Sequence, residues 1–325
     1  MLRLAVKVLS VFVLSAEILC AQPSQLTEAE ALSAIALATN PTTKLAAAED
    51  FINRFPKSSS RIKAAELVAA EILKVQNGTV AIALVERAHS IFTTDEEREI
   101  LKPVALEAYA TGNRPKDAFK LAAELLAKNP NDLYVLVQMT RAGAEEVRKR
   151  NREHAEIALQ YGLKAIALIE AAPKVSRVAD DLSAKPLSDY TSELGPLHQQ
   201  IAILYLGTGN TEAAKAQLTK AATQRPDDPT NYALLGRVMH AEYVKQMEAY
   251  EGLPEGKQKQ ETLKKIDALL DPIIDVYARA AGLALGRQEY QRLMQQVIPD
   301  LTTYYKYRNN QSTKGLQQLI NKYRR

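Results

Sequence analysis

The chain has 325 residues, of which 46% are hydrophobic, 6% are aromatic and none is tryptophan, and its formal net charge is +4. So many apolar residues with so few aromatic ones predict a helical core of alanine and leucine, because strands favour β-branched and aromatic residues in alternation. The net charge is too small to indicate a nucleic-acid-binding protein.

Residues 1–21 have the composition of a secretory signal peptide. Two basic residues, Arg3 and Lys7, precede an apolar run over residues 8–16 that is too short to span a bilayer. We therefore expect an exported protein, periplasmic or secreted, that is cleaved after Ala21. The alternative is a buried first helix of a cytosolic protein.

Cys20 is the only cysteine of the chain and lies within this segment. Cleavage after Ala21 would leave the mature chain without a thiol nucleophile, a disulfide or a cysteine metal ligand. A lipoprotein signal would have a small residue directly before the cysteine, and here that residue is Leu19. Lipidation of Cys20 is therefore the less favoured alternative.

The segment that follows predicts pairs of amphipathic helices. Thr27 with Glu30 and Thr94 with Glu97 have the spacing of a capping box, in which each side chain bonds to a free amide of the first helical turn. The acidic residues after Thr94 therefore have a structural use at a helix start and do not indicate catalysis. Between the two boxes, helices are expected over residues 42–55, 59–76 and 80–92.

Longer helices are expected over residues 132–149 and 153–172, and two interruptions follow them. Residues 174–195 and 252–260 have no clear period and predict loops or irregular helix. Long loops in a compact array often carry function, so both are candidates for a partner-specific surface. An insertion without a role is the alternative.

The C-terminal part departs from the preceding pattern. Asp271 followed by Pro272 predicts a helix start, with the aspartate as cap and the proline in the first turn. A further helix from about Gln288 includes Pro299, and the last helix of the chain is expected to cap the array.

One pattern recurs with a period of 34 residues. Its two copies are His198, Ile201, Ala202 and Tyr205, then Tyr232, Leu235, Gly236 and Met239. Gly209, Ala214, Ala221 and Pro226 lie between the copies, and Tyr109, Ala118, Leu125 and Pro130 repeat part of the spacing. Small residues allow two helices to approach closely, glycine suits the turn between them, and proline prevents the second helix from continuing.

This pattern resembles the tetratricopeptide repeat (TPR), a helix-turn-helix unit of the same period. The resemblance implies an all-α, TPR-like α-solenoid, a right-handed superhelix of antiparallel helix pairs with a C-terminal capping helical segment. We expect repeats over residues 22–250, clearest at 99–130 and 195–243, and a C-terminal helical extension over 251–325.

The resemblance also implies a non-enzymatic scaffold that binds a peptide or helix in its concave groove, and the signal-like segment favours another envelope protein as the partner. The predicted groove residues are Gln199, Ile203, Ala233, Arg237 and His240. This set lacks the lysines and asparagines with which some TPR domains bind a C-terminal carboxylate, so we do not expect that mode of binding.

The end of the chain is basic. Its cations are Lys306, Arg308, Lys314, Lys322, Arg324 and Arg325, and tyrosines lie among them. They could contact an anionic surface, which would fit an alternative function as a membrane-associated envelope-assembly factor held by this tail or by lipid on Cys20. A solvated capping helix whose basic last turn complements its dipole is the simpler interpretation.

Motifs of catalysis or metal binding are not recognisable in the sequence. The four histidines have no neighbouring ligand at metal-binding spacing, and no serine lies in a nucleophile elbow. We therefore expect no enzyme activity, no metal and no cofactor.

Overall fold

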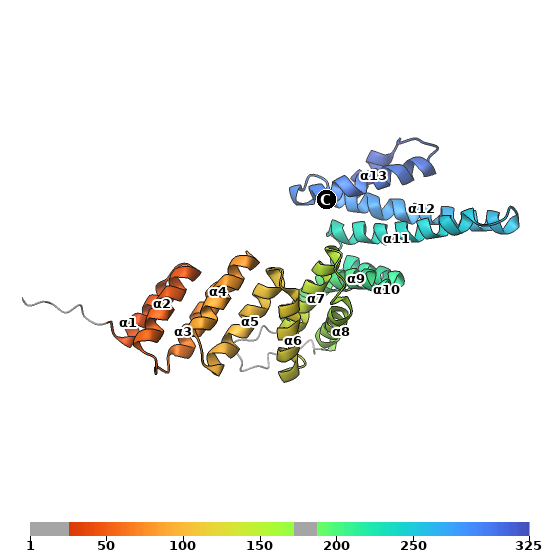
Figure 1. The fold of residues 1–325 in the computed structure, drawn as a ribbon. Helices are drawn as coiled ribbons and strands as arrows, with labels where there is room; N and C mark the ends of the chain where they lie inside the picture. The colour runs from red at the N-terminus through yellow and green to blue at the C-terminus, as the bar shows by residue number, and fades with distance from the viewer. Residues whose placement is uncertain (1–25, 172–186, 325) are drawn as a thin grey trace, which may run out of the picture. The chain divides into compact units, whose positions relative to one another are not determined.

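The computed structural model describes residues 26–171 and 187–324, and these residues form fourteen α-helices, two short 3-10 helices and no strand (Figure 1). The predicted all-α class is therefore confirmed. None of the described helices combines the length and the hydropathy needed to cross a bilayer. The predicted signal peptide with Cys20, Arg325 and most of the insertion 174–195 lie outside the described residues.

Two compact units make up the chain. We call residues 1–74 with 86–101 the first unit, and residues 75–85 with 102–325 the second unit. The first unit contains α1 (Glu28–Leu37), α2 (Pro41–Arg54), α3 (Arg61–Ile72) and parts of α4 (Gly78–Ile91) and α5 (Asp95–Thr111). Its fully buried apolar side chains include Ile35, Leu45, Phe51 and Val68.

Both predicted capping boxes are confirmed. The Thr27 side chain accepts a hydrogen bond from the Glu30 amide, and the Glu30 carboxylate accepts one from the Thr27 amide at 2.8 Å. At the start of α5, the Glu97 carboxylate accepts from the Thr94 amide at 3.0 Å, and the Glu97 amide donates to Thr94 Oγ1 at 3.3 Å. Local spacing alone predicted these bonds.

Glu97 has a second partner that the local spacing does not indicate. Its side chain is 1% exposed, and Arg61 binds it from α3 through Nε at 2.7 Å and Nη2 at 3.1 Å. Burial by itself would raise the pKa of Glu97, but the hydrogen bonds from Arg61 and from the amide of Thr94 outweigh it and lower that pKa. Arg61 also donates to the Pro56 carbonyl and so connects three segments.

The second unit continues with helix pairs. Its next elements are α6 (Pro115–Lys128), α7 (Leu133–Arg148), α8 (Ala155–Ala171), the 3-10 helix η1 (Leu187–Glu193), α9 (Leu194–Thr208) and α10 (Thr211–Gln224). The predicted interruption 174–195 therefore ends in helix, because η1 and the start of α9 occupy its last residues.

The small residues of the repeat pattern lie where helices meet. Ala118, Ala202, Ala214 and Ala221 have no exposed surface. Gly209 ends α9 with a φ of 84°, a left-handed conformation that favours glycine. The TPR-like packing that the sequence predicts is thus present in the second unit.

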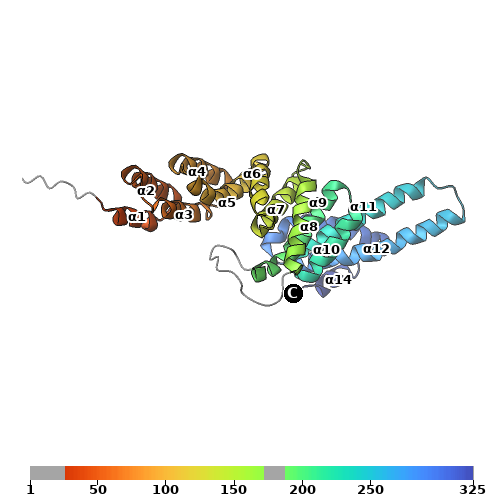
Figure 2. The same cartoon turned by 90° about the horizontal axis from the view of Figure 1, so that it is seen from below.

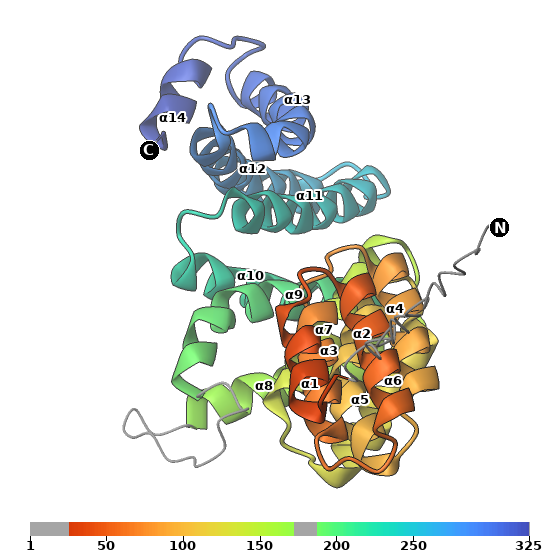
Figure 3. The same cartoon turned by 90° about the vertical axis from the view of Figure 1, so that its left-hand side faces the viewer.

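The C-terminal helices are α11 (Pro229–Glu251), α12 (Lys257–Ala284), the 3-10 helix η2 (Gln288–Tyr290), α13 (Gln291–Arg308) and α14 (Leu316–Lys322). Figure 3 shows α11, α12 and α13 as successive layers. Because α12 packs against α11, the pairing of helices continues beyond residue 250. The predicted interruption 252–260 is only a short loop, since α12 begins at Lys257.

The predicted helix start at Asp271 is wrong, because Pro272 lies inside α12. A proline in a helix removes one backbone hydrogen bond and costs about 3 kcal/mol or more. Ile273, Ile274 and Tyr277, which follow it, are buried between the neighbouring helices, and this burial offsets the cost.

The hairpin of α11 and α12 extends past its neighbours. Figures 1 and 2 show its closed end beyond α9 and α10. We call residues 245–265 the arm. At the closed end, Lys259 bonds to Glu255 at 2.6 Å and lies 5.3 Å from the ring centre of Tyr250.

Candidate binding site

Two of the five predicted groove residues are inaccessible. Ile203 and Ala233 are each 4% exposed, Ile203 in a core with Met139 and Leu204 and Ala233 in a core with Tyr277. Neither side chain can therefore line an open groove, because Met139 of α7 lies in the core that buries Ile203 and Tyr277 of α12 in the core that buries Ala233.

The other three predicted groove residues connect α9, α11 and α13. We call these three the first helices, because each is the first helix of its pair. Gln199 on α9 donates to Asn231 on α11 at 2.7 Å, Arg237 on α11 donates to Gln296 on α13, and His240 on α11 bonds to the Tyr304 hydroxyl on α13. Binding of a partner by these residues stays a prediction.

Tyr304 anchors the contact between α11 and α13. Burial, with the nearby Tyr243 and Asp300, raises the pKa of Tyr304 to about 12, so its hydroxyl stays protonated at neutral pH. Its ring meets that of Tyr243 edge to face, with 5.5 Å between ring centres. α13 thereby takes the place of a further first helix, although its sequence lacks the repeat pattern.

Two apolar side chains outside the predicted groove set are exposed on these first helices. Val244 on α11 is 38% exposed and Tyr307 on α13 is 52% exposed. Burial raises the pKa of Tyr243, which precedes Val244, and the nearby Tyr307 raises it further. We call Val244 and Tyr307 the apolar pair. Hydrophobic periodicity could not reveal them, because they lie off the buried stripes of both helices.

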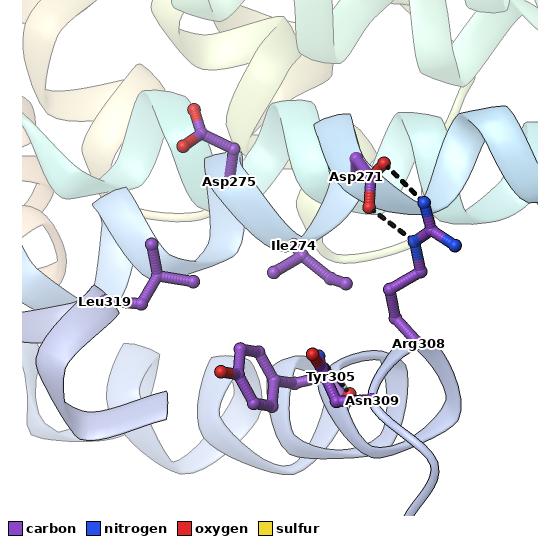
Figure 4. Close-up of a pocket in the computed structure, with 7 residues that line it drawn as sticks. All are labelled: Asp271, Ile274, Asp275, Tyr305, Arg308, Asn309 and Leu319. Carbon is purple, nitrogen blue, oxygen red and sulfur yellow. Dashed lines mark hydrogen bonds and ion pairs between the residues drawn. The ribbon is translucent and has the colours of Figure 1, made fainter. Parts of the chain in front are cut away.

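A pocket of about 400 Å³ lies between α12, α13 and α14 (Figure 4). Asp271 and Arg308 lie at one end and Leu319 at the other, with Ile274 and Tyr305 between them. The remaining lining residues are Asp275 and Asn309.

Most polar groups of the pocket are held by neighbours. Arg308 binds both oxygens of Asp271, at 2.8 Å and 3.1 Å, and these hydrogen bonds lower the pKa of Asp271. The Tyr305 hydroxyl donates to the Lys314 carbonyl at 2.8 Å. Asp275 accepts a hydrogen bond from the Tyr323 hydroxyl and is otherwise exposed. These contacts fix the walls before any ligand arrives.

The wall supplied by α14 depends on Gly282 of α12. A Cβ atom at Gly282 would lie 2.4 Å from the Ile320 carbonyl oxygen and 2.6 Å from the Tyr323 Cβ. Arg279 of α12 contributes to the same contact, since its guanidinium lies 5.9 Å from the ring centre of Tyr323, and it also lies 4.5 Å from that of Tyr232 on α11.

Gly282→Ala is therefore expected to displace α14 while leaving the rest of the second unit folded. Amide hydrogen exchange in residues 316–323 should become faster, because the backbone of α14 cannot keep its present distance from α12. Exchange in α9 and α10 is the internal reference. Unchanged protection of α14 would show that the close backbone contact does not position this helix.

The basic tail is only partly available for an anionic surface. Arg308 is neutralised by Asp271, whereas Lys306, Lys314, Lys322 and Arg324 are exposed. Contact with an anionic surface stays a prediction.

Within the described residues, no three histidine, cysteine or acidic side chains gather as a metal site would require. His198, which the repeat pattern places at a packing position, is buried and bonds to Gln217 at 2.6 Å. Burial lowers its pKa, so it packs as a neutral residue at neutral pH.

Several solved structures have a similar arrangement of helices. A tetratricopeptide repeat protein from Parabacteroides merdae has a TM-score of 0.42 and 13% identity, over 79% of this chain and 92% of that one. A mutant of IFIT1 solved with m7Gppp-AAAA has a TM-score of 0.43 and 16% identity, over 87% of this chain and 55% of that one. The pilF protein of Pseudomonas aeruginosa has a TM-score of 0.38 and 18% identity, over 72% of this chain and 97% of that one.

These similarities concern the helical fold alone. This chain spans about half the length of the IFIT1 chain. No protein-family model matches the chain, and no curated protein matches it.

Proposed function

We propose that the chain is a non-enzymatic scaffold of the cell envelope that binds another protein along the first helices α9, α11 and α13. The observation that supports this most is the exposure of the apolar pair on two adjacent first helices. Exposed aromatic and aliphatic side chains beside polar ones are the usual anchors of a protein interface. Export follows from the signal-like segment at residues 1–21 and belongs to the proposal.

The site differs from the one that the repeat pattern predicts. Arg237 and His240 already bond to α13. The proposed binding surface therefore lies further along α11, at Val244, and at Tyr307 of α13. The bonds between first helices hold this surface rigid, which lowers the entropy cost of binding.

Replacing the apolar pair, with Val244→Ser and Tyr307→Ser in one chain, is expected to reduce partner capture at least tenfold. Loss of one buried anchor typically costs 1–2 kcal/mol or more of binding free energy. The measurement is in-cell crosslinking followed by affinity capture and quantification of each captured protein.

The matched control is Leu163→Ser on α8, which removes another exposed apolar side chain, 39% exposed, from a second helix of the same unit. Capture should be unchanged in this variant. Equal yields from the wild type, the paired variant and the control would contradict binding at the apolar pair, and recovery of no specific partner would contradict the scaffold function.

A membrane-associated assembly factor is the second candidate, supported by the exposed lysines near the C-terminus. The intact mass of the mature protein decides its lipidated form. A chain that starts near Gln22 without a modification would exclude lipid on Cys20.

A further inference from the structure

We propose that the pocket between α12, α13 and α14 binds the cationic side chain of an arginine or lysine. That this side chain belongs to a protein partner rests on the proposed function, whereas the chemistry of the pocket does not.

The charges of the pocket favour a cation. Asp271 and Arg308 neutralise each other through two hydrogen bonds. Asp275 accepts a hydrogen bond from the Tyr323 hydroxyl, a partner that carries no positive charge. One carboxylate therefore remains for an incoming cation, and its exposure lets that cation approach.

The end of α13 adds to this preference. The amide of Asn309 bonds back to the carbonyls of Tyr305 and Lys306, so the pocket lies at the C-terminal end of this helix. The C-terminus of a helix carries a partial negative charge, which stabilises cations nearby.

The middle of the pocket suits an aliphatic stem. Ile274 is buried, Leu319 is partly buried, and the Tyr305 ring faces the same space (Figure 4). The side chains of arginine and lysine combine such a stem with a charged end, and an aromatic face attracts the charge as well. A volume of about 400 Å³ accommodates one such side chain.

Other ligand classes fit less well. An anion would meet two carboxylates and a helix C-terminus, and the one guanidinium in the lining is already bound by Asp271. A neutral apolar ligand would leave the Asp275 charge without a partner. Lys322 opposes a cation, and its ammonium lies 5.0 Å from the ring centre of Tyr323; among the described residues it forms no ion pair with Asp275.

The test is a titration of the full chain with N-acetyl-arginine amide and N-acetyl-lysine amide, followed by NMR. Signals of residues 305–309 and 316–320 should shift with both probes. N-acetyl-norleucine amide, which has the stem without the charge, should cause much smaller shifts, and N-acetyl-glutamate amide none.

Asp275→Asn is expected to weaken binding of both cationic probes about fivefold, the usual effect of losing one partly exposed ion pair. Asparagine can still accept from Tyr323, so the fold of the pocket is kept. Asp275→Glu should retain binding, and Glu251→Gln, which removes an exposed carboxylate at the end of α11, should not change it.

Equal binding of the norleucine probe, or no effect of Asp275→Asn, would overturn the proposal. The test is independent of the scaffold function. If the cationic probes bind while no partner is captured in cells, the pocket proposal stands and the proposed function fails. If a partner is captured while the cationic probes do not bind, the proposed function stands and the pocket proposal fails.

Discussion

Glu97→Ala is expected to lower the free energy of unfolding by about 3–5 kcal/mol, the usual cost of removing one partner from a buried ion pair. The substitution leaves the Arg61 guanidinium, whose side chain is 14% exposed, without its carboxylate. It also removes the acceptor of the Thr94 amide at the start of α5. Urea unfolding followed by circular dichroism measures the change.

Glu96→Ala is the control, because Glu96 is an exposed acidic neighbour in the same first turn. It should change the unfolding free energy by at most about 0.5 kcal/mol. Arg61→Ala should cost about as much as Glu97→Ala, and the double variant less than their sum. Equal effects of Glu96→Ala and Glu97→Ala would show that the buried pair adds nothing to stability.

The Glu97 contribution should also depend on pH. Its pKa in the folded chain is lower than the ordinary value of 4.5, so its stabilisation is fully present above the unfolded value. That stabilisation is lost as the pH falls through the lowered folded value. The difference between the wild type and Glu97→Gln should therefore shrink below pH 4.5.

Gly143→Ala is expected to destabilise the second unit by about 1–3 kcal/mol, the typical cost of overpacking a core. A Cβ atom at Gly143 on α7 would lie 2.2 Å from the Ala158 Cβ on α8. Because that atom is attached to the backbone, it cannot rotate away and the two helices must separate. The effect opposes the gain of about 1 kcal/mol that alanine normally brings to a helix interior.

Gly252→Ala provides the matched control. Gly252 follows α11 with a φ of −77°, and a Cβ there would meet only the Ala249 carbonyl, at 3.7 Å. Its effect on the free energy of unfolding should stay within about 0.5 kcal/mol. If Gly143→Ala is as stable as this control, the contact between α7 and α8 is more adaptable than the structure indicates.

Features that depend on neighbouring residues could be predicted from the sequence. The capping boxes at Thr27 and Thr94 follow from a spacing of three residues, and Ala202 and Ala214 follow from the helical period. Contacts between residues far apart in the sequence have no local spacing or period that would predict them. Arg61 reaches Glu97 across 36 residues, and nothing in the local sequence of Arg61 indicates this pairing.

In the C-terminal helices, the burial of side chains outweighs the local sequence preference. Proline normally suggests a helix start or break, yet Pro272 lies within α12 because buried residues follow it on the same helix. Two of the predicted groove residues are buried for a related reason. Ile203 and Ala233 lie on first helices, but their exposure depends on how closely the neighbouring helices approach, which repeat positions do not specify.

A ligand that contacts both the closed end of the arm and the pocket must have a minimum length. Lys257 at the start of α12 lies fourteen residues before Asp271 on the same helix, a separation of about 21 Å at 1.5 Å per residue. An extended peptide advances about 3.3–3.6 Å per residue. A segment with one anchor at each place would need its two anchors about six positions apart, and a shorter one could occupy only one place at a time.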